Sequence, residues 1–136
     1  MMKRLFCVLA ALCLCFTVDC LAEEYLAFIK DKADAIKVSL EQEVQTQTEM
    51  NQQSESLRAL WDEALDHLLL KAENTLSKTE MENLTAEQNA WEAGMTAAVE
   101  TAGKEFAGGS MYPLVVNTEA ARLTEERVYQ LFEFLK

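Results

Sequence analysis

Apolar residues recur every three or four positions through most of the chain, which is the spacing of one face of an α-helix. This pattern predicts helices over 23–44, 56–76 and 79–106, followed by a last helix that runs to the C-terminus. Neither Gly nor Pro occurs over 23–93, so no strong helix breaker interrupts that region. We therefore expect an all-α fold, a small helical bundle of about four helices with a central antiparallel helix hairpin formed by the second and third.

The ends of the third helix are predicted from local signals. Thr79 and Glu82 have the spacing of a capping box, in which a hydroxyl and a carboxylate satisfy free backbone N–H groups. Gly108 and Gly109 permit a stop after the last apolar position, because glycine adopts left-handed conformations without strain. The third helix is thus expected to begin near Thr79 and to end just before the glycine pair.

The other boundaries depend on polar residues and one proline. Pro113 is excluded from a helix interior and biases Tyr112 towards extended geometry, which predicts a crossing loop there. Asn117 or Thr118 would then cap the last helix. The polar stretch 45–56 leaves open whether the first two helices bend or run straight, and its candidate caps are Asn51, Ser54 and Ser56.

Four residues inside the predicted helices bear on packing. Trp61 and Trp91 fall on the apolar faces of their helices, so we expect both in the core rather than exposed as binding anchors. Gly94 and Gly103 weaken the third helix by about 1 kcal/mol each relative to alanine. Close approach of a neighbouring backbone would explain their presence.

The first 22 residues are organised as a secretory signal. Lys3 and Arg4 precede an apolar run over 5–16, and the segment closes with a small residue, Ala22, suited to cleavage. The run is too short to remain as a membrane anchor, which needs about 18 apolar residues. We expect a signal peptide over 1–22, a mature domain over 23–136, and a periplasmic or secreted location.

The predicted mature domain is strongly acidic. The chain has 23 Asp and Glu against 12 Lys and Arg, and removal of Lys3, Arg4 and Asp19 with the signal leaves 22 against 10, a formal charge of −12. Such a protein should repel nucleic acid and anionic membranes and attract basic partners. Solubility alone is the alternative interpretation.

Candidate chemistry is sparse. All four cysteines lie within the signal, so the mature domain has no disulfide and no thiol nucleophile. Glu63, Asp66 and His67 resemble part of a helical metal site, but the chain has one histidine, and an exposed helical histidine is the better interpretation. Ser110 has no nearby histidine and is read as a turn residue. We predict no catalytic residue, no metal, no cofactor and no enzyme activity.

Five segments occur in the order in which one known family carries them. They span residues 46–131 and read Thr46-Gln-Thr-Glu-Met-Asn51, Asp62-Glu-Ala-Leu-Asp66, Leu84-Thr-Ala-Glu-Gln-Asn-Ala-Trp91, Gly108-Gly-Ser110 and Leu123-Thr-Glu-Glu-Arg-Val-Tyr-Gln-Leu131. Together they resemble the LprI-type lysozyme inhibitor domain family. The resemblance implies a small, exported, helical protein, and it gives structural roles to Leu65, Gln88, Trp91, Leu123 and Arg127.

The chain departs from the family pattern at several positions. The family usually carries cysteines at positions that correspond approximately to Gln53, Val99 and Glu119 of this chain. Since none of these residues is cysteine here, the disulfide bridges of the family are absent. Met95 replaces an arginine that commonly follows the tryptophan, and Asp66 replaces an asparagine. If any of these positions contacts lysozyme, its departure from the family residue should weaken inhibition.

Two functions of different classes follow. One is an exported domain that binds and inhibits a basic lysozyme through acidic side chains and a polar loop, and the other is a structural or assembly module of the cell envelope that binds another protein or itself. Neither involves nucleic acid or a stable membrane anchor, and the oligomeric state stays open. The expected binding residues lie in or beside the one irregular stretch: Gly108, Gly109, Ser110, Tyr112, Glu105 and Glu119.

Overall fold

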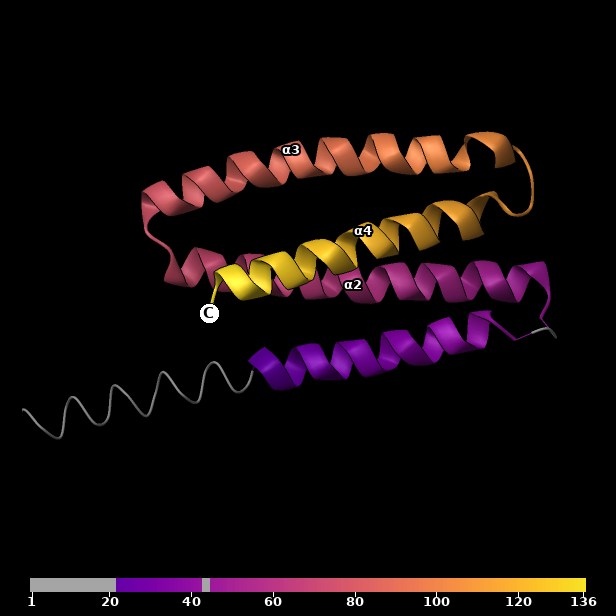
Figure 1. Cartoon of the computed structure of the whole chain (residues 1–136), viewed down its shortest axis with the longest axis horizontal. Helices are drawn as coiled ribbons and strands as arrows, with labels where there is room; N and C mark the ends of the chain where they lie inside the picture. Colours follow the sequence, from indigo (N-terminus) through magenta and orange to yellow (C-terminus); the bar gives the residue numbers. More distant parts are fainter. Residues whose placement is uncertain (1–21, 43–44) are drawn as a thin grey trace, which may run out of the picture.

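The computed structural model describes residues 22–42 and 45–136. Most of the predicted signal (1–21) and residues 43 and 44, where the first helix is predicted to end, lie outside the described residues. The described chain forms an N-terminal helix over 22–40, then α2 (Gln47–Thr75), α3 (Lys78–Gly103), a short 3₁₀ turn η1 (Lys104–Phe106) and α4 (Tyr112–Phe134). No strand occurs among these residues, so the predicted all-α bundle is confirmed (Figure 1).

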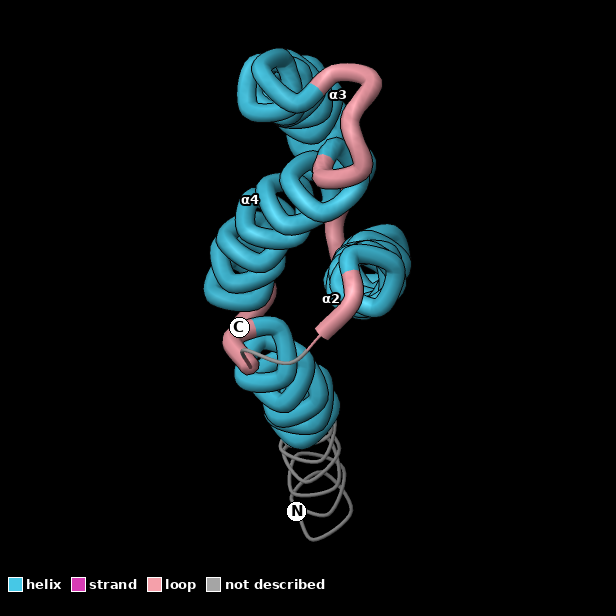
Figure 2. The backbone as a smooth tube through the Cα atoms, turned by 90° about the vertical axis from the view of Figure 1, so that its right-hand side faces the viewer, coloured by secondary structure: helices cyan, strands magenta, loops and turns pink. Residues whose placement is uncertain are grey.

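The helices form a three-helix body with a fourth helix on its outside. Figure 2, which looks along the bundle, shows the N-terminal helix, α2 and α4 around a common centre and α3 beyond α4. The predicted hairpin turns back as expected, but α4 lies between α2 and α3 over most of their length (Figure 1). Among α2, α3 and α4, the most extensive contact is that of α2 with α4, and α3 packs mainly on α4. The periodic pattern identified the apolar face of each helix but not the helix that covers it.

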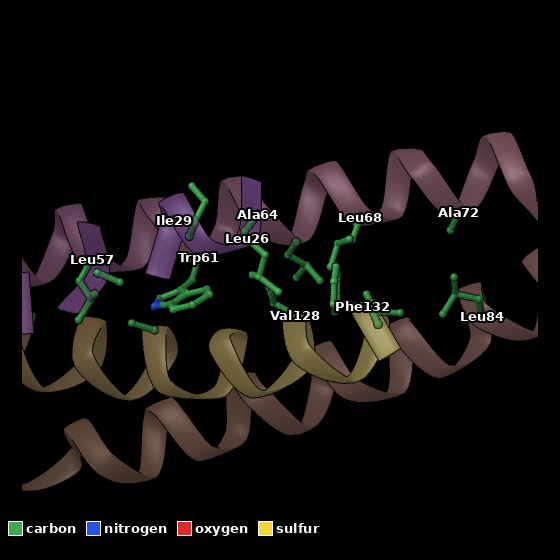
Figure 3. Close-up of a cluster of buried hydrophobic side chains, with 14 residues drawn as sticks. Leu26, Ile29, Leu57, Trp61, Ala64, Leu68, Ala72, Leu84, Val128 and Phe132 are labelled. Carbon is green, nitrogen blue, oxygen red and sulfur yellow. The ribbon is translucent and has the colours of Figure 1, made fainter. Parts of the chain in front are cut away.

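The core runs along the centre of the three-helix body (Figure 3). Trp61 and Val128 are fully buried, and Ile29 brings the N-terminal helix into the same cluster. Burying an aromatic side chain removes about 150–250 Å² from water, so Trp61 is a major contributor to stability. From α3 only Leu84 enters this cluster, beside Ala72 of α2, near the turn that joins these two helices (Figure 3).

The helix α2 begins earlier than its apolar pattern indicates. Its N-cap is Thr46, whose hydroxyl accepts from the backbone N–H of Glu49 while the Glu49 carboxylate accepts from the N–H of Thr46 at 2.7 Å. The predicted start near residue 56 is therefore wrong, and Asn51, Ser54 and Ser56 are interior positions. The break between the first two helices lies before Thr46.

The helix α3 also begins earlier than predicted. Ser77, not Thr79, is its N-cap, and Ser77 forms the capping box with Glu80. Both Ser77 and Thr79 are followed three residues later by glutamate, so spacing alone did not separate the two. The connection between α2 and α3 is thereby reduced to Leu76 and Ser77.

The helix α4 begins at Tyr112, so the crossing loop predicted over 110–116 is wrong from Tyr112 onward, and so is the predicted cap at Asn117 or Thr118. Pro113 lies in the first helical turn, where the missing N–H is not needed and the fixed φ suits a helix. Tyr112 is consequently helical rather than extended. Asn117 instead packs against α2, where its amide lies 3.5 Å from the Ser54 hydroxyl.

The two helical glycines have different environments. A Cβ on Gly103 would lie 2.6 Å from Val116 Cγ1 and 2.7 Å from the Tyr112 ring, so a close approach does occur there, to side chains rather than backbone. A Cβ on Gly94 would meet nothing within 4 Å, so the same explanation is wrong at Gly94. Trp91 is half-buried at the edge of the core, unlike the fully buried Trp61.

Candidate functional site

The candidate site is the end of the bundle where α3 passes into α4, which we call the loop end. It comprises the described residues in 40–50 and residues 100–119 (Figure 1). The N-terminal helix ends there and α2 begins there, so every helix contributes to this surface. The opposite end, where α2 turns into α3, is called the turn end and comprises residues 70–85.

The loop between α3 and α4 has a defined backbone path. It passes through η1 and then a turn in which the Gly109 N–H donates to the Phe106 carbonyl at 2.9 Å. Gly108 has φ +78°, a left-handed conformation that side chains with a Cβ rarely adopt. The Tyr112 N–H donates to the Gly109 carbonyl at 3.2 Å, which leads the chain directly into α4.

A side chain of α2 holds this loop in place. Asn51 Nδ2 donates to the Ser110 carbonyl at 3.0 Å, although the two residues are 59 positions apart. Asn51 is itself oriented by the Gln47 amide, which donates to its Oδ1 at 2.9 Å. The exposed loop is therefore tied to the rigid start of α2.

Behind the loop, polar side chains join α2 to α4. Arg58 lies 3.4 Å from Asn117 Oδ1 and 3.5 Å from Asp62, and the buried Thr124 hydroxyl lies 3.4 Å from Asp62 Oδ1. These long contacts are individually weak. Asn117 and Thr124 thereby add polar contacts between α4 and α2, whereas the Arg58–Asp62 pair lies within α2.

A hollow of about 430 Å³ opens at the loop end. All four helices line it, and five of the lining residues are apolar: Leu40, Met50, Ala102, Leu114 and Val115. The two polar lining residues are Thr118 and Glu119. The volume falls within the range of about 300–1,000 Å³ that is usual for ligand pockets.

Glu119 is held in a fixed position at this hollow. Arg122 donates to both carboxylate oxygens, at 2.7 and 2.9 Å. This pairing lowers the pKa of Glu119, so the carboxylate is ionised at neutral pH. Arg122 also pairs with Glu126 at 2.6 Å, so the three side chains keep one net negative charge.

Both ends of the bundle are acidic. Among the described residues of the loop end, five glutamates stand against one lysine, Lys104, a formal charge of −4. Residues 70–85 carry three glutamates and two lysines, and the helix ends beside them add Glu23, Glu24 and Glu133 against Lys136, so the formal charge at the opposite end is −3. The loop-end glutamates are Glu41, Glu49, Glu100, Glu105 and Glu119.

The loop end contains all six residues expected to bind. Gly108, Gly109 and Ser110 are exposed, and Tyr112 retains 38% of its surface beside Met111 with 43%. Glu105 is exposed next to them, whereas Glu119 is half-buried through its pairing with Arg122. The role of Asn51 as the loop anchor is not predictable from local sequence, because it joins segments far apart in the chain. The same holds for the hollow formed by Met50, Leu114 and Val115.

The residues expected to be structural lie between the helices. Arg127 Nε donates to Gln88 Oε1 at 3.0 Å, and both side chains are buried at the contact of α4 with α3. Leu65 is in the core, and Leu123 is half-buried. The buried Gln88 and Arg127 pair fixes where α3 lies along α4.

The weak metal motif has a structural role. The ring of His67 packs on Tyr25 with centroids 4.4 Å apart, which joins α2 to the N-terminal helix. Over residues 22–42 and 45–136, no group of three or more His, Cys, Asp or Glu side chains is placed to hold a metal ion. Within the same residues, no helix is long and apolar enough to cross a membrane.

Comparison with known proteins identifies the domain. The family model described as Lysozyme inhibitor LprI matches residues 39–131, more than half of the chain and all of α2 and α3. Searches of curated proteins and of solved structures find no match. The matched family is one of inhibitors rather than enzymes. The chain therefore belongs to the LprI lysozyme inhibitor family.

Proposed function

We propose that the mature protein binds a basic lysozyme with its loop end and thereby prevents the enzyme from reaching peptidoglycan. The observation that carries the proposal is the charge of −4 around an exposed loop that is tied to rigid helices. Opposite fields raise association rates and favour correct encounters, while adding less to the final affinity. Family membership supplies the class of partner.

The loop supplies contacts that charge alone does not. Met111 and Tyr112 present apolar and aromatic surface beside the exposed backbone of Gly108 and Gly109. Aromatic side chains are frequent centres of binding energy at protein interfaces, and rings of polar contacts exclude water around them. The loop would thus contribute a slow dissociation rate, and the glutamates a fast association rate.

Export is part of the same proposal. Lysozyme acts on the cell wall, so an inhibitor must leave the cytoplasm, and residues 1–22 have the organisation of a secretory signal. Cleavage after Ala22 would keep Leu26, Ile29 and Ala33 in the mature chain, and these residues contribute the N-terminal helix's share of the core. The mature domain should therefore fold without the leader.

The test is residual lysis of a peptidoglycan suspension by lysozyme as mature protein is added. We expect inhibition at low ionic strength that weakens as salt approaches physiological levels, because exposed charges more than about 10 Å apart are screened at 0.1 M. Replacing Ser110 and Tyr112 with alanine should weaken inhibition further. Unchanged lysis at a large molar excess in low salt would contradict the function, whereas full inhibition by the double variant would contradict only the site.

A second function is favoured by the sparse burial of α3. This 26-residue helix buries only Leu84, Gln88 and Gly103, so most of its length faces away from the core. An envelope module that binds another protein would use such a helix as its contact surface. Capture from an envelope extract that is lost on substitutions along α3, combined with absence of lysozyme binding, would favour this function.

A further inference from the structure

We propose that the hollow at the loop end seats one apolar side chain of the partner that has a cationic side chain next to it. The inference deepens the proposed function, since it names the feature that a basic partner must present to this end. The hollow is bounded by the N-terminal helix, α2, α3 and α4, so its shape is set by the packing of the whole bundle. A site of this kind is preformed.

The walls of the hollow favour an apolar occupant. Leu40, Met50, Leu114 and Val115 are all half-buried, which leaves part of each side chain facing the opening. Methionine is flexible and polarisable, so Met50 can adapt to aromatic or branched occupants. An apolar side chain that enters would displace water from these walls, which is the main favourable contribution at interface centres.

The rim of the hollow favours a cation beside that apolar side chain. Glu119 lines the hollow, and its carboxylate is ionised and held by Arg122. An adjoining hollow shares Leu40 and Thr118, but its charged lining residues, Glu41, Glu125, Lys37 and Arg122, balance one another, so the negative charge near the rim comes from Glu119 and the other loop-end glutamates. A second copy of this chain would bring its own negative end to the site and be repelled, as would an anionic lipid. A basic protein surface has the complementary charge.

The turn end provides an internal comparison. Its hollow of about 510 Å³ is larger, but among its lining residues only Leu76 and Met81 are apolar. The cation Lys78 also lies in its wall, together with Glu73 and Glu82. This hollow lacks the continuous apolar wall and has a lysine in its lining, so the same occupant should not bind there.

The direct test uses a probe peptide and the methyl groups of the intact mature protein. Capped Arg-Trp-Arg at millimolar concentration should shift the methyl NMR signals of Met50, Leu114 and Val115 in a saturable manner. Capped Arg-Ala-Arg and Glu-Trp-Glu should not, because the first lacks the apolar anchor and the second has the wrong charge. Unshifted methyl signals with Arg-Trp-Arg would overturn the proposal, whatever the protein does to lysozyme.

The second test fills the hollow. Ala102→Phe should raise the dissociation rate from lysozyme at least tenfold while leaving the association rate within about twofold, because the charges are unchanged. Thr85→Phe fills the hollow of the turn end from the same helix and should change neither rate. Val115→Thr keeps the shape of the wall but makes it less apolar, so it should also raise the dissociation rate. This variant provides an independent test if Ala102→Phe does not fold.

The outcomes separate this inference from the proposed function. If a folded Ala102→Phe protein inhibits lysozyme and dissociates from it at the parent rate, the hollow is not the binding site, although the protein is still a lysozyme inhibitor. If the parent does not inhibit lysozyme but Arg-Trp-Arg shifts the three methyl signals, the proposed function fails and the hollow stands as a site for another basic partner.

Discussion

The two ends of the bundle reverse the chain in different ways. At the turn end, Leu76 and Ser77 are enough, because the capping box of Ser77 and Glu80 satisfies the first backbone N–H groups of α3. At the loop end, the connection takes residues 104–111, and α4 starts without a side-chain cap. A short capped turn leaves little backbone for a partner, whereas a longer loop anchored by one side chain presents its backbone and side chains on a fixed frame.

The largest expected effect concerns the charge of the loop end. Replacing Glu100 and Glu105 with lysine at the loop end should slow association with lysozyme at least tenfold at low salt, because the formal charge of the docking surface rises from −4 to 0 and the attraction is lost. Replacing Glu73 and Glu82 with lysine at the turn end changes the total charge by the same amount and should slow it no more than about twofold. Stopped-flow binding at two ionic strengths measures both. Equal slowing would mean that total charge, and not the loop end, steers the encounter.

The next effect concerns packing at Gly103. A methyl group at this position would overlap Val116 and the Tyr112 ring, so Gly103→Ala should destabilise the fold by about 1–3 kcal/mol. Gly94→Ala on the same helix has free space and should stabilise by about 1 kcal/mol, because alanine favours helix more than glycine. Urea unfolding of both variants gives the comparison. Similar stabilities would show that α3 and the start of α4 do not pack closely.

The capped turn should depend on one hydroxyl. Ser77→Ala removes the side chain that accepts from the Glu80 N–H and should cost about 1 kcal/mol of stability. Lysozyme inhibition should be unchanged, since this substitution lies at the opposite end from the loop. Thermal melting measures the stability, and the lysis assay measures the inhibition. A loss of inhibition in a folded Ser77→Ala protein would show that lysozyme binds the turn end rather than the loop end.

At the loop end, the loss of one hydrogen bond should affect binding more than stability. Asn51→Ala removes the hydrogen bond to the Ser110 carbonyl, which at a surface position contributes about 0.5–1.5 kcal/mol at most. Stability should therefore change little, while amide exchange at residues 108–111 becomes faster and inhibition weaker. Asn74→Ala, on an exposed α2 residue at the turn end, serves as the control. Unaltered exchange in the loop would contradict an anchoring role for Asn51.

The smallest effect is a pH dependence shared by the two capping boxes. Hydrogen bonds from Thr46 lower the pKa of Glu49, and hydrogen bonds from Ser77 lower the pKa of Glu80, below the ordinary value of 4.5. A depressed folded-state pKa means that the stabilisation is complete above the unfolded pKa and is lost as pH falls through the folded pKa. Melting temperatures should thus fall between about pH 5 and pH 3, and less steeply in Glu80→Gln than in the parent. An equal slope in both proteins would show that the Glu80 carboxylate contributes nothing measurable.

The sequence predicted helices well and their ends poorly. Apolar spacing located the helices because each buries one face, and this requirement is local. Two capping signals two residues apart, Ser77 with Glu80 and Thr79 with Glu82, are equivalent in sequence, and tertiary packing selects between them. Pro113 was read as a loop residue because it ends helices from inside, although it is equally suited to a first turn.

The sequence predicted the loop of the candidate site but not the residues that surround it. Gly108, Gly109 and Ser110 stood out because irregular stretches are rare in this chain. The Asn51 contact and the wall formed by Leu40, Met50 and Val115 join residues from distant segments, and no local pattern contains that information. The pairing of Gln88 with Arg127 is of the same kind, since each residue was singled out but their contact depends on α3 packing against α4.

Amide hydrogen exchange of the complex would show directly whether lysozyme binds the loop end. Exchange would be measured on the mature protein alone and with saturating lysozyme in low salt. We expect slower exchange in residues 104–112 and at the start of α2, with the turn at Leu76 and Ser77 unchanged. Protection confined to the turn end or to the outer face of α3, or no protection under conditions where the two proteins bind, would contradict it.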